Sequence, residues 1–167
     1  MNLPIPQKIN AQKYKVGISV FKKRANNIKL SANESALGPS PKAIKKFLKV
    51  SKNLKRYPDN NGFFLKKTIA KKFKIDSKKI ILGSGSDQIF ELICRTFLKK
   101  GDEVIVPQFS FIIYRIYSKI CGARVIYARE NNYKISIKNI LSKVSSKTKI
   151  VFLANPNNPT GTILTKK

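Results

Sequence analysis

The sequence predicts an α/β fold, a three-layer α/β/α arrangement around a mostly parallel sheet, preceded by an extended N-terminal arm. Short apolar segments alternate with helical patterns from residue 79 onward, which is typical of parallel sheets. Three of these segments run directly into turn-forming residues. Residues 1–40, in which prolines and glycines recur with only weak periodicity, predict the arm. At 167 residues and 42% hydrophobic, the chain is long enough to bury one sizeable core.

The arm is followed by two predicted helices. Ser40 and Pro41 begin the first, with the serine as N-cap and the proline at the first helical position, and it continues to about Ser51. The stretch RYPDNNG, residues 56–62, consists of turn-forming residues. It leads into a second predicted helix at about 63–73.

Strands and helices alternate regularly after these helices. The predicted strands are 79–82, 103–106, 123–127 and 149–154, and the helices between them are 86–98, 110–121 and 136–144. Parallel strands covered on both faces are apolar along their length, so polar residues should collect where strands end. Ligands of open α/β sheets bind outside the carboxyl ends of the strands. The segments after residues 82, 106 and 154 therefore predict one shared binding site.

The formal net charge of +27 raises the alternative of a basic nucleic-acid-binding domain. The lysines, however, are spread along the whole chain. Lys42, Lys45, Lys46 and Lys49 fall at the helical spacing of a solvated face. We therefore expect no specific nucleic-acid partner, and the nucleic-acid-binding domain is kept as the alternative of another class.

No apolar run approaches the roughly 20 residues of a membrane span, and the first residues lack the apolar centre of a signal peptide, so we expect a cytoplasmic protein with no membrane partner. The two cysteines, Cys94 and Cys121, lie in apolar helical patterns and are interpreted as small buried residues of a reducing compartment. The chain has no histidine and no cysteine cluster, which excludes a zinc site and a histidine-based catalytic dyad.

The stretch GSGSDQ, residues 83–88, follows the first predicted strand. Ser86 and Asp87 stand at the first turn of a helix, where backbone N–H groups without intrahelical partners can hold a phosphate. Gln88 stands where the dinucleotide-binding fingerprint has its third glycine, so that fingerprint is excluded. The alternative is a tight strand-to-helix turn in which Ser86 or Asp87 only caps the helix.

The stretch FSFIIYRIY, residues 109–117, places several aromatic side chains near or on a helix. Aromatic residues at helical spacing usually pack in the core. Phe111 lies nearest the end of the preceding strand, so it is the one positioned to stack on a planar ligand.

NPNNPTG, residues 155–161, is the most specific motif, since turning the chain does not require three amides. The two prolines restrict the residues before them, which leaves Asn158 held with an amide that can donate to or accept from a ligand. The alternative is an asparagine- and proline-rich turn without a ligand.

Five stretches together resemble a known family. They are LSANES at 30–35, GPSP at 38–41, RYPDNNG at 56–62, IILGSGSDQ at 80–88 and NPNNPTG at 155–161. In this order and spacing they resemble the fold type I pyridoxal-phosphate-dependent aminotransferases of class I and II. Within these, the similarity is strongest to the histidinol-phosphate aminotransferases, and it extends from Leu30 to Gly161.

The resemblance implies the cofactor pyridoxal 5'-phosphate and a role for the residues that match its motifs. Ser86 and Asp87 would bind the cofactor phosphate at the start of their helix. Phe111 would stack on the pyridine ring, and Asn158 would hydrogen-bond the phenolic oxygen of the ring.

The resemblance also implies a homodimer with shared sites, because Tyr57 would reach the cofactor phosphate of the neighbouring subunit. Asn33 and Glu34 would bind substrate, in the arm that closes over it. Residues 1–40 would form the N-terminal arm and the start of the small domain, and 41–167 the first part of the cofactor-binding large domain.

The implied reaction is a transamination between two small molecules in histidine biosynthesis: L-histidinol phosphate and 2-oxoglutarate give imidazole-acetol phosphate and L-glutamate. Three alternatives stay open besides the nucleic-acid-binding domain. They are an aminotransferase of the same fold that acts on aromatic amino acids, a decarboxylase of phosphorylated amino acids, and an inactive fragment.

The sequence departs from the family pattern at Ser35, Gln88 and Phe109, where asparagine, glutamate and proline are common. The family's Schiff-base lysine lies beyond the NPTG motif. Lys166 and Lys167 follow that motif too closely to take its place, so the resemblance implies that this chain has no catalytic residue of its own. We therefore expect the chain to be the N-terminal portion of a longer enzyme and to be inactive alone.

Overall fold

The computed structural model describes residue 11 and residues 32–165. These residues fall into two compact units, which divide between Leu82 and Gly83. Most of the predicted N-terminal arm lies outside the described residues. Lys166 and Lys167, at the other end of the chain, also lie outside them. The division that the sequence predicts at residue 40 stays a prediction.

The unit that ends at Leu82 contains two α-helices and a short 3-10 helix. The helices are α1 (Pro41–Ser51) and α2 (Phe63–Phe73), and the 3-10 helix is η1 (Ser77–Lys79). Both α-helices have the predicted bounds. Ser40 is the N-cap of α1, but its side chain makes no capping hydrogen bond.

The turn between α1 and α2 is held by Asp59, whose carboxylate accepts from the backbone N–H groups of Asn61 and Phe63. Gly62 has a φ of +59°, and a Cβ added there would meet the side chain of Leu82. The backbone conformation favours glycine at this position.

The predicted strand at 79–82 is wrong. Lys79 ends the 3-10 helix η1, and residues 80–82 belong to no strand. Ile80 does have an extended backbone, with φ −105° and ψ 123°. A strand also requires a neighbour to hydrogen-bond with, and in the described part of the chain these residues have none.

The unit that begins at Gly83 contains a three-stranded parallel sheet. Its strands are β1 (Glu103–Pro107), β2 (Arg124–Ala128) and β3 (Thr148–Val151), in the spatial order β2-β1-β3. Its helices are α3 (Gly85–Phe97), α4 (Ile112–Ile120) and α5 (Ile137–Leu141). The predicted α/β class with a parallel sheet is confirmed.

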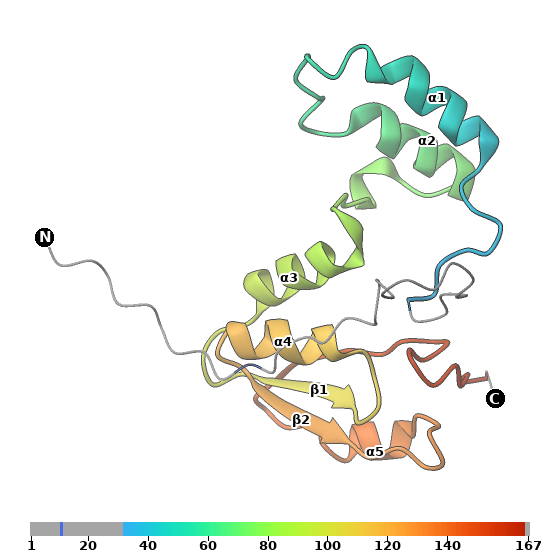
Figure 1. The fold of residues 1–167 in the computed structure, drawn as a ribbon. Coiled ribbons are helices and arrows are strands. Elements are labelled where there is room, and N and C mark those ends of the chain that lie inside the picture. The colour runs from blue at the N-terminus through green and yellow to red at the C-terminus, as the bar shows by residue number, and fades with distance from the viewer. Residues whose placement is uncertain (1–10, 12–31, 166–167) are drawn as a thin grey trace, which may run out of the picture. The chain divides into compact units, whose positions relative to one another are not determined.

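The sheet is covered on both faces, as Figure 1 shows with α4 on one side and α5 on the other. Side chains alternate along the central strand: Val104 and Val106 point to one face and Ile105 to the other. The first face packs against α3 and α4 in a cluster that includes Cys94, Leu98, Tyr114, Ala123 and Phe152. The second packs with Ala128, Ile135 and Ile140.

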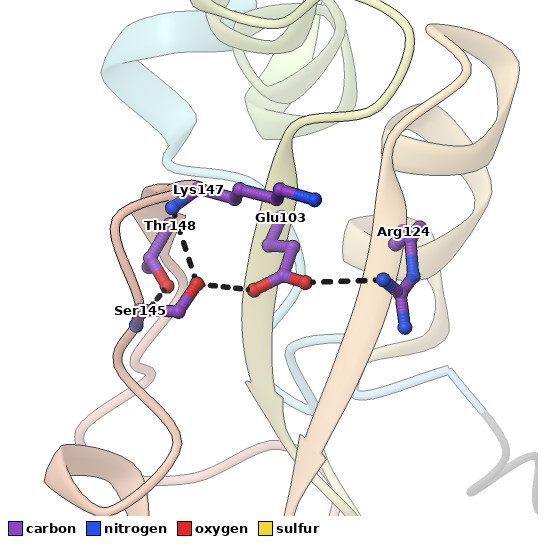
Figure 2. Close-up of polar contacts among 5 residues, drawn as sticks. All are labelled: Glu103, Arg124, Ser145, Lys147 and Thr148. Atoms are coloured by element: carbon purple, nitrogen blue, oxygen red, sulfur yellow. Dashed lines mark hydrogen bonds and ion pairs between the residues drawn. The ribbon is translucent and has the colours of Figure 1, made fainter.

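Polar side chains tie the three strands together at their amino ends, as Figure 2 shows. The Glu103 carboxylate accepts from the hydroxyl of Ser145, at 2.6 Å, and lies 3.4 Å from the guanidinium of Arg124. Ser145 also accepts from the backbone N–H of Lys147. Glu103 pairs in register with Arg124 and Thr148, so this cluster supports the register of the sheet at the end opposite the predicted site.

Two helices of this unit are shorter than predicted. Helix α4 begins at Ile112 because Phe111 has an extended backbone, with φ −58° and ψ 128°, and serves as the N-cap. Helix α5 ends at Leu141, and two hydrogen bonds of the 3-10 type follow it. The N–H of Lys143 donates to the carbonyl of Ile140, and the N–H of Val144 donates to the carbonyl of Leu141.

Within the described residues, no helix is both long and apolar enough to cross a bilayer.

Candidate functional site

Two segments meet at the carboxyl edge of the sheet: residues 108–111 after β1 and residues 152–161 after β3. A cleft of about 690 Å³ connects them, lined by Gln108, Phe109, Ser110, Arg115, Tyr127 and Pro159. The structure therefore brings together two of the three predicted segments, as expected for strands that are parallel neighbours.

The segment after β1 is fixed by hydrogen bonds of three consecutive backbone N–H groups. That of Gln108 donates to the carbonyl of Ala128, at 3.0 Å, and that of Ser110 donates to the carbonyl of Pro107, at 3.2 Å. The hydroxyl of Ser110 donates to the same carbonyl. The N–H of Phe109 donates to the side chain of Glu130, at 3.2 Å.

Phe111 ends this segment and is half-buried. Its ring meets that of Tyr114 edge to face, with the centroids 5.9 Å apart, and it packs at the border of the core cluster on the α3–α4 face. One part of the ring is therefore supported by the core while another part is accessible, which is what a stacking platform requires.

The first two asparagines of NPNNPTG hold the chain in place. The side chain of Asn155 donates to the carbonyl of Leu164, at 3.1 Å, and accepts from the N–H of the same residue, at 3.0 Å. Asn157 is only 3% exposed, and its amide donates to the hydroxyl of Thr160, at 2.9 Å. Thr162 continues this network, since its hydroxyl lies 2.9 Å from that of Thr160 and donates to the carbonyl of Tyr133.

The third asparagine differs from the other two. Asn158 is half-buried, and within the part of the chain that the structure describes its amide makes no hydrogen bond. Its neighbours in the chain are the buried Asn157 and Pro159, which lines the cleft. Asn155 and Asn157 each donate a side-chain hydrogen bond, although the buried Oδ1 atom of Asn157 has no partner, whereas the Asn158 amide makes none within the described residues.

The third predicted segment forms the start of α3, and Ser86 and Asp87 lie in its first turn as predicted. Neither caps the helix, because no side chain makes a capping hydrogen bond there. Instead, the backbone N–H of the N-cap Ser84 donates to the side chain of Gln88, at 2.6 Å. A Cβ built on Gly85 would have no atom within 4 Å, so the space beside this turn is open. The first N–H groups of α3 can therefore donate hydrogen bonds to an anion.

The remaining predicted residues belong to the other compact unit. Asn33, Glu34 and Tyr57 lie before Leu82 and are exposed. Tyr57 is 99% exposed and, among the described residues, makes no hydrogen bond.

The cysteines do not take part in this edge of the sheet. Cys94 is fully buried, and burial raises the pKa of its thiol to about 11, so it stays protonated at neutral pH. Cys121 is half-buried, and both thiols are free. The described residues contain no group of histidine, cysteine or acidic side chains that could hold a metal ion.

Glu130 is a residue that sequence reasoning missed. It lies two residues after β2 and is 6% exposed, and its Oε2 atom is buried without a hydrogen-bond partner. Burial raises the pKa of this carboxyl above its ordinary value, and the bond from the N–H of Phe109 partly offsets that shift. The only signal in the sequence is its place after a strand, at the same edge as the predicted site.

The raised pKa of Glu130 predicts a pH-dependent effect of Glu130→Gln on stability. The folded state holds the carboxyl proton to higher pH than the unfolded chain does, so this group costs stability as the pH rises above its ordinary pKa of 4.5. The glutamine resembles the neutral acid and does not titrate. In melting curves of the full-length apoprotein, we expect the variant to gain stability relative to the wild type between pH 4.5 and 7.5. A difference that is constant over this range would contradict the prediction.

The sequence profile of the family described as Aminotransferase class I and II matches residues 25–167. The chain belongs to this family. Solved structures of other aminotransferases share its fold. One is histidinol-phosphate aminotransferase from Sinorhizobium meliloti in complex with pyridoxal-5'-phosphate, with a TM-score of 0.73 and 24% identity over 77% of this chain and 35% of that one. Another is an aromatic aminotransferase from Pyrococcus horikoshii OT3, with a TM-score of 0.68 and 28% identity over 77% and 38%.

Two curated members of this aminotransferase family illustrate the similarity in sequence. The histidinol-phosphate aminotransferase of Pelagibacter ubique is 54% identical over 99% of this chain and 46% of its own length. That of Paramagnetospirillum magneticum is 40% identical over 96% of this chain and 44% of its own length. The chain thus spans a little less than half the length of these relatives.

Proposed function

We propose that this chain is part of a pyridoxal-phosphate-dependent transaminase of histidine biosynthesis, which moves the amino group of L-histidinol phosphate to 2-oxoglutarate. The observation that carries this proposal is the 54% identity, over nearly the whole chain, to a histidinol-phosphate aminotransferase.

The residues present fit pyridoxal phosphate. The cofactor needs a site for its phosphate, a surface for its ring and a partner for its ring oxygen. The uncapped start of α3 at Ser86 and Asp87 supplies the first, and the supported ring of Phe111 supplies the second. The free amide of Asn158 supplies the third. Bound at this edge, the cofactor supplies an electron sink for the carbanion that remains after the α-proton leaves the substrate.

Each of these residues has a distinct task in the proposal. The N–H groups of Ser86 and Asp87 neutralise part of the phosphate charge and anchor the cofactor at one end. Phe111 sets the plane of the ring and excludes water from one of its faces. Asn158 donates to the ring oxygen and so adjusts its proton affinity. The residue that abstracts the α-proton, the Schiff-base lysine of the family, is proposed to lie outside residues 1–167.

The proposal also includes the three predicted residues before Leu82, which are Tyr57, Asn33 and Glu34. The full exposure of Tyr57 suits a side chain that serves a neighbouring subunit, so we include a homodimer with shared sites. Asn33 and Glu34 are proposed to lie over the substrate. The predicted cytoplasmic location stays a prediction.

The proposal is tested with the full-length protein loaded with pyridoxal phosphate. Addition of L-histidinol phosphate alone should convert the absorbance of the bound cofactor to that of pyridoxamine phosphate, and 2-oxoglutarate should reverse the change. Phenylalanine at the same concentration should react at least about tenfold more slowly. Faster conversion by phenylalanine would favour the aromatic aminotransferase, and loss of carbon dioxide from a phosphorylated amino acid would favour the decarboxylase.

The nucleic-acid-binding alternative makes a separate prediction. If the lysines form a solvated surface, binding of the full-length protein to unrelated duplex DNA should be weak and should disappear between about 50 and 200 mM salt. Fluorescence anisotropy with a labelled duplex measures this directly. Sequence-selective binding that survives physiological salt would contradict the prediction and support a nucleic-acid partner.

A further inference from the structure

We propose that Glu130 is a positioning residue for the cofactor ring, which it serves by holding the backbone of the segment that carries Phe111. This inference rests on the proposed function, because it assigns Phe111 the ring-stacking role. The bond that carries it runs from the N–H of Phe109 to Oε1 of Glu130, at 3.2 Å.

Glu130 gives the segment after β1 its only side-chain hydrogen bond from a different part of the described chain. Gln108 still belongs to the backbone ladder with β2, and Ser110 bonds back to Pro107 within the segment itself. Phe109 lies between them, and its N–H would have no protein acceptor without Glu130. Phe111 follows two residues later and is the N-cap of α4. Movement at Phe109 would therefore be transmitted to the ring of Phe111 through a single intervening residue.

The burial of Glu130 sets it apart from a surface carboxylate that happens to reach a backbone group. It is 6% exposed, although acidic side chains are rarely buried to this extent. In the described residues, neither of its oxygens forms an ion pair, and Oε2 has no hydrogen-bond partner. A carboxyl group kept in such surroundings at the edge of the predicted site costs stability, which suits a role in positioning better than a role in holding the fold together.

A cleft beside Glu130 gives a second contact between its surroundings and the segment after β1. A small cleft of about 280 Å³ is lined by Glu130 together with Gln108, Phe109, Arg129, Asn132 and Tyr133. The ring of Phe109 lies 5.2 Å from that of Tyr133, measured between centroids. The side chain and the backbone N–H of Phe109 both contact the segment that follows β2.

The test compares three variants of the full-length protein. Glu130→Ala removes the acceptor, and Glu130→Gln keeps an oxygen at the Oε1 position. Glu91→Ala is the matched control, since among the described residues the Glu91 carboxylate bonds only to Arg95, one turn along α3. Pyridoxal phosphate is titrated into each apoprotein at one pH, and the visible circular dichroism of the bound cofactor is recorded together with the melting temperature. Glu130→Asp, which keeps the charge but shortens the reach, serves if the alanine variant does not fold.

We expect Glu130→Ala, or Glu130→Asp in its place, to weaken cofactor binding by about tenfold and to change the circular dichroism of the ring. Glu130→Gln should restore both to near the wild-type values, and Glu91→Ala should change neither. Unchanged affinity and spectrum in the folded alanine or aspartate variant would overturn the inference, and so would a glutamine variant as impaired as the alanine one. A wild-type protein that does not bind the cofactor would overturn the proposed function itself.

Discussion

Asn158→Ala in the full-length enzyme should lower cofactor affinity or turnover by about one to two orders of magnitude and leave the melting temperature of the apoprotein nearly unchanged. A hydrogen bond to a charged group contributes roughly 1.5 to 3 kcal/mol, and this factor follows if the amide donates to the ring oxygen. The apoprotein should be insensitive, because the Asn158 amide has no hydrogen-bond partner among the described residues. Cofactor titration and melting curves measure the two effects separately.

Asn157→Ala is the matched comparison and should give the opposite result. Its side chain is 3% exposed and donates to Thr160, so its removal leaves a buried cavity and takes one hydrogen bond away from the Thr160 hydroxyl, which still pairs with Thr162. Loss of such a bond costs about 1 to 3 kcal/mol, and the apoprotein should melt at a lower temperature by several degrees. If the two variants behave alike, the asparagines only form the turn and Asn158 has no cofactor role.

Tyr57→Phe should also weaken cofactor binding, by about tenfold, since in the proposed dimer it removes one hydrogen bond to the charged phosphate of the neighbouring site. The stronger form of this prediction concerns hybrid dimers. A subunit with Tyr57→Phe is mixed with a subunit whose cofactor-binding lysine is disabled. The only complete lysine site in the hybrid then receives Tyr57 from the disabled subunit, and its activity should approach that of one wild-type site. A hybrid that is no more active than the Tyr57→Phe dimer would show that Tyr57 does not serve the neighbouring site.

The elements that the sequence predicts best are those with local signals at both ends. Helix α1 begins at Pro41, where a proline at the first helical position needs no hydrogen-bond partner, and it ends at Ser51 as predicted. Strand β1 is predicted as a buried strand because Val104, Ile105 and Val106 are all apolar, and such a strand requires cover on both faces. In the structure these side chains alternate between the two core clusters.

The features that sequence reasoning misses depend on distant parts of the chain. Residues 79–82 have the composition of a strand, but a strand exists only beside another one. The burial of Glu130 and the hydrogen bond of Asn157 are likewise products of packing between segments. The restricted backbone of Asn158 could be anticipated, because Pro159 acts locally on the residue before it. The contrast of its amide with those of Asn155 and Asn157 appears only in the folded chain.

The most direct test of the central claim is a crystal structure of the full-length protein with pyridoxal phosphate bound. The claim is that the start of α3, the end of the β1 segment and the NPNNPTG motif form one cofactor site. We expect the phosphate at the N–H groups of Ser86 and Asp87, the ring against Phe111, and the amide of Asn158 within hydrogen-bond distance of the ring oxygen. A cofactor bound elsewhere, or one bound here with the Asn158 amide turned away from it, would contradict this claim.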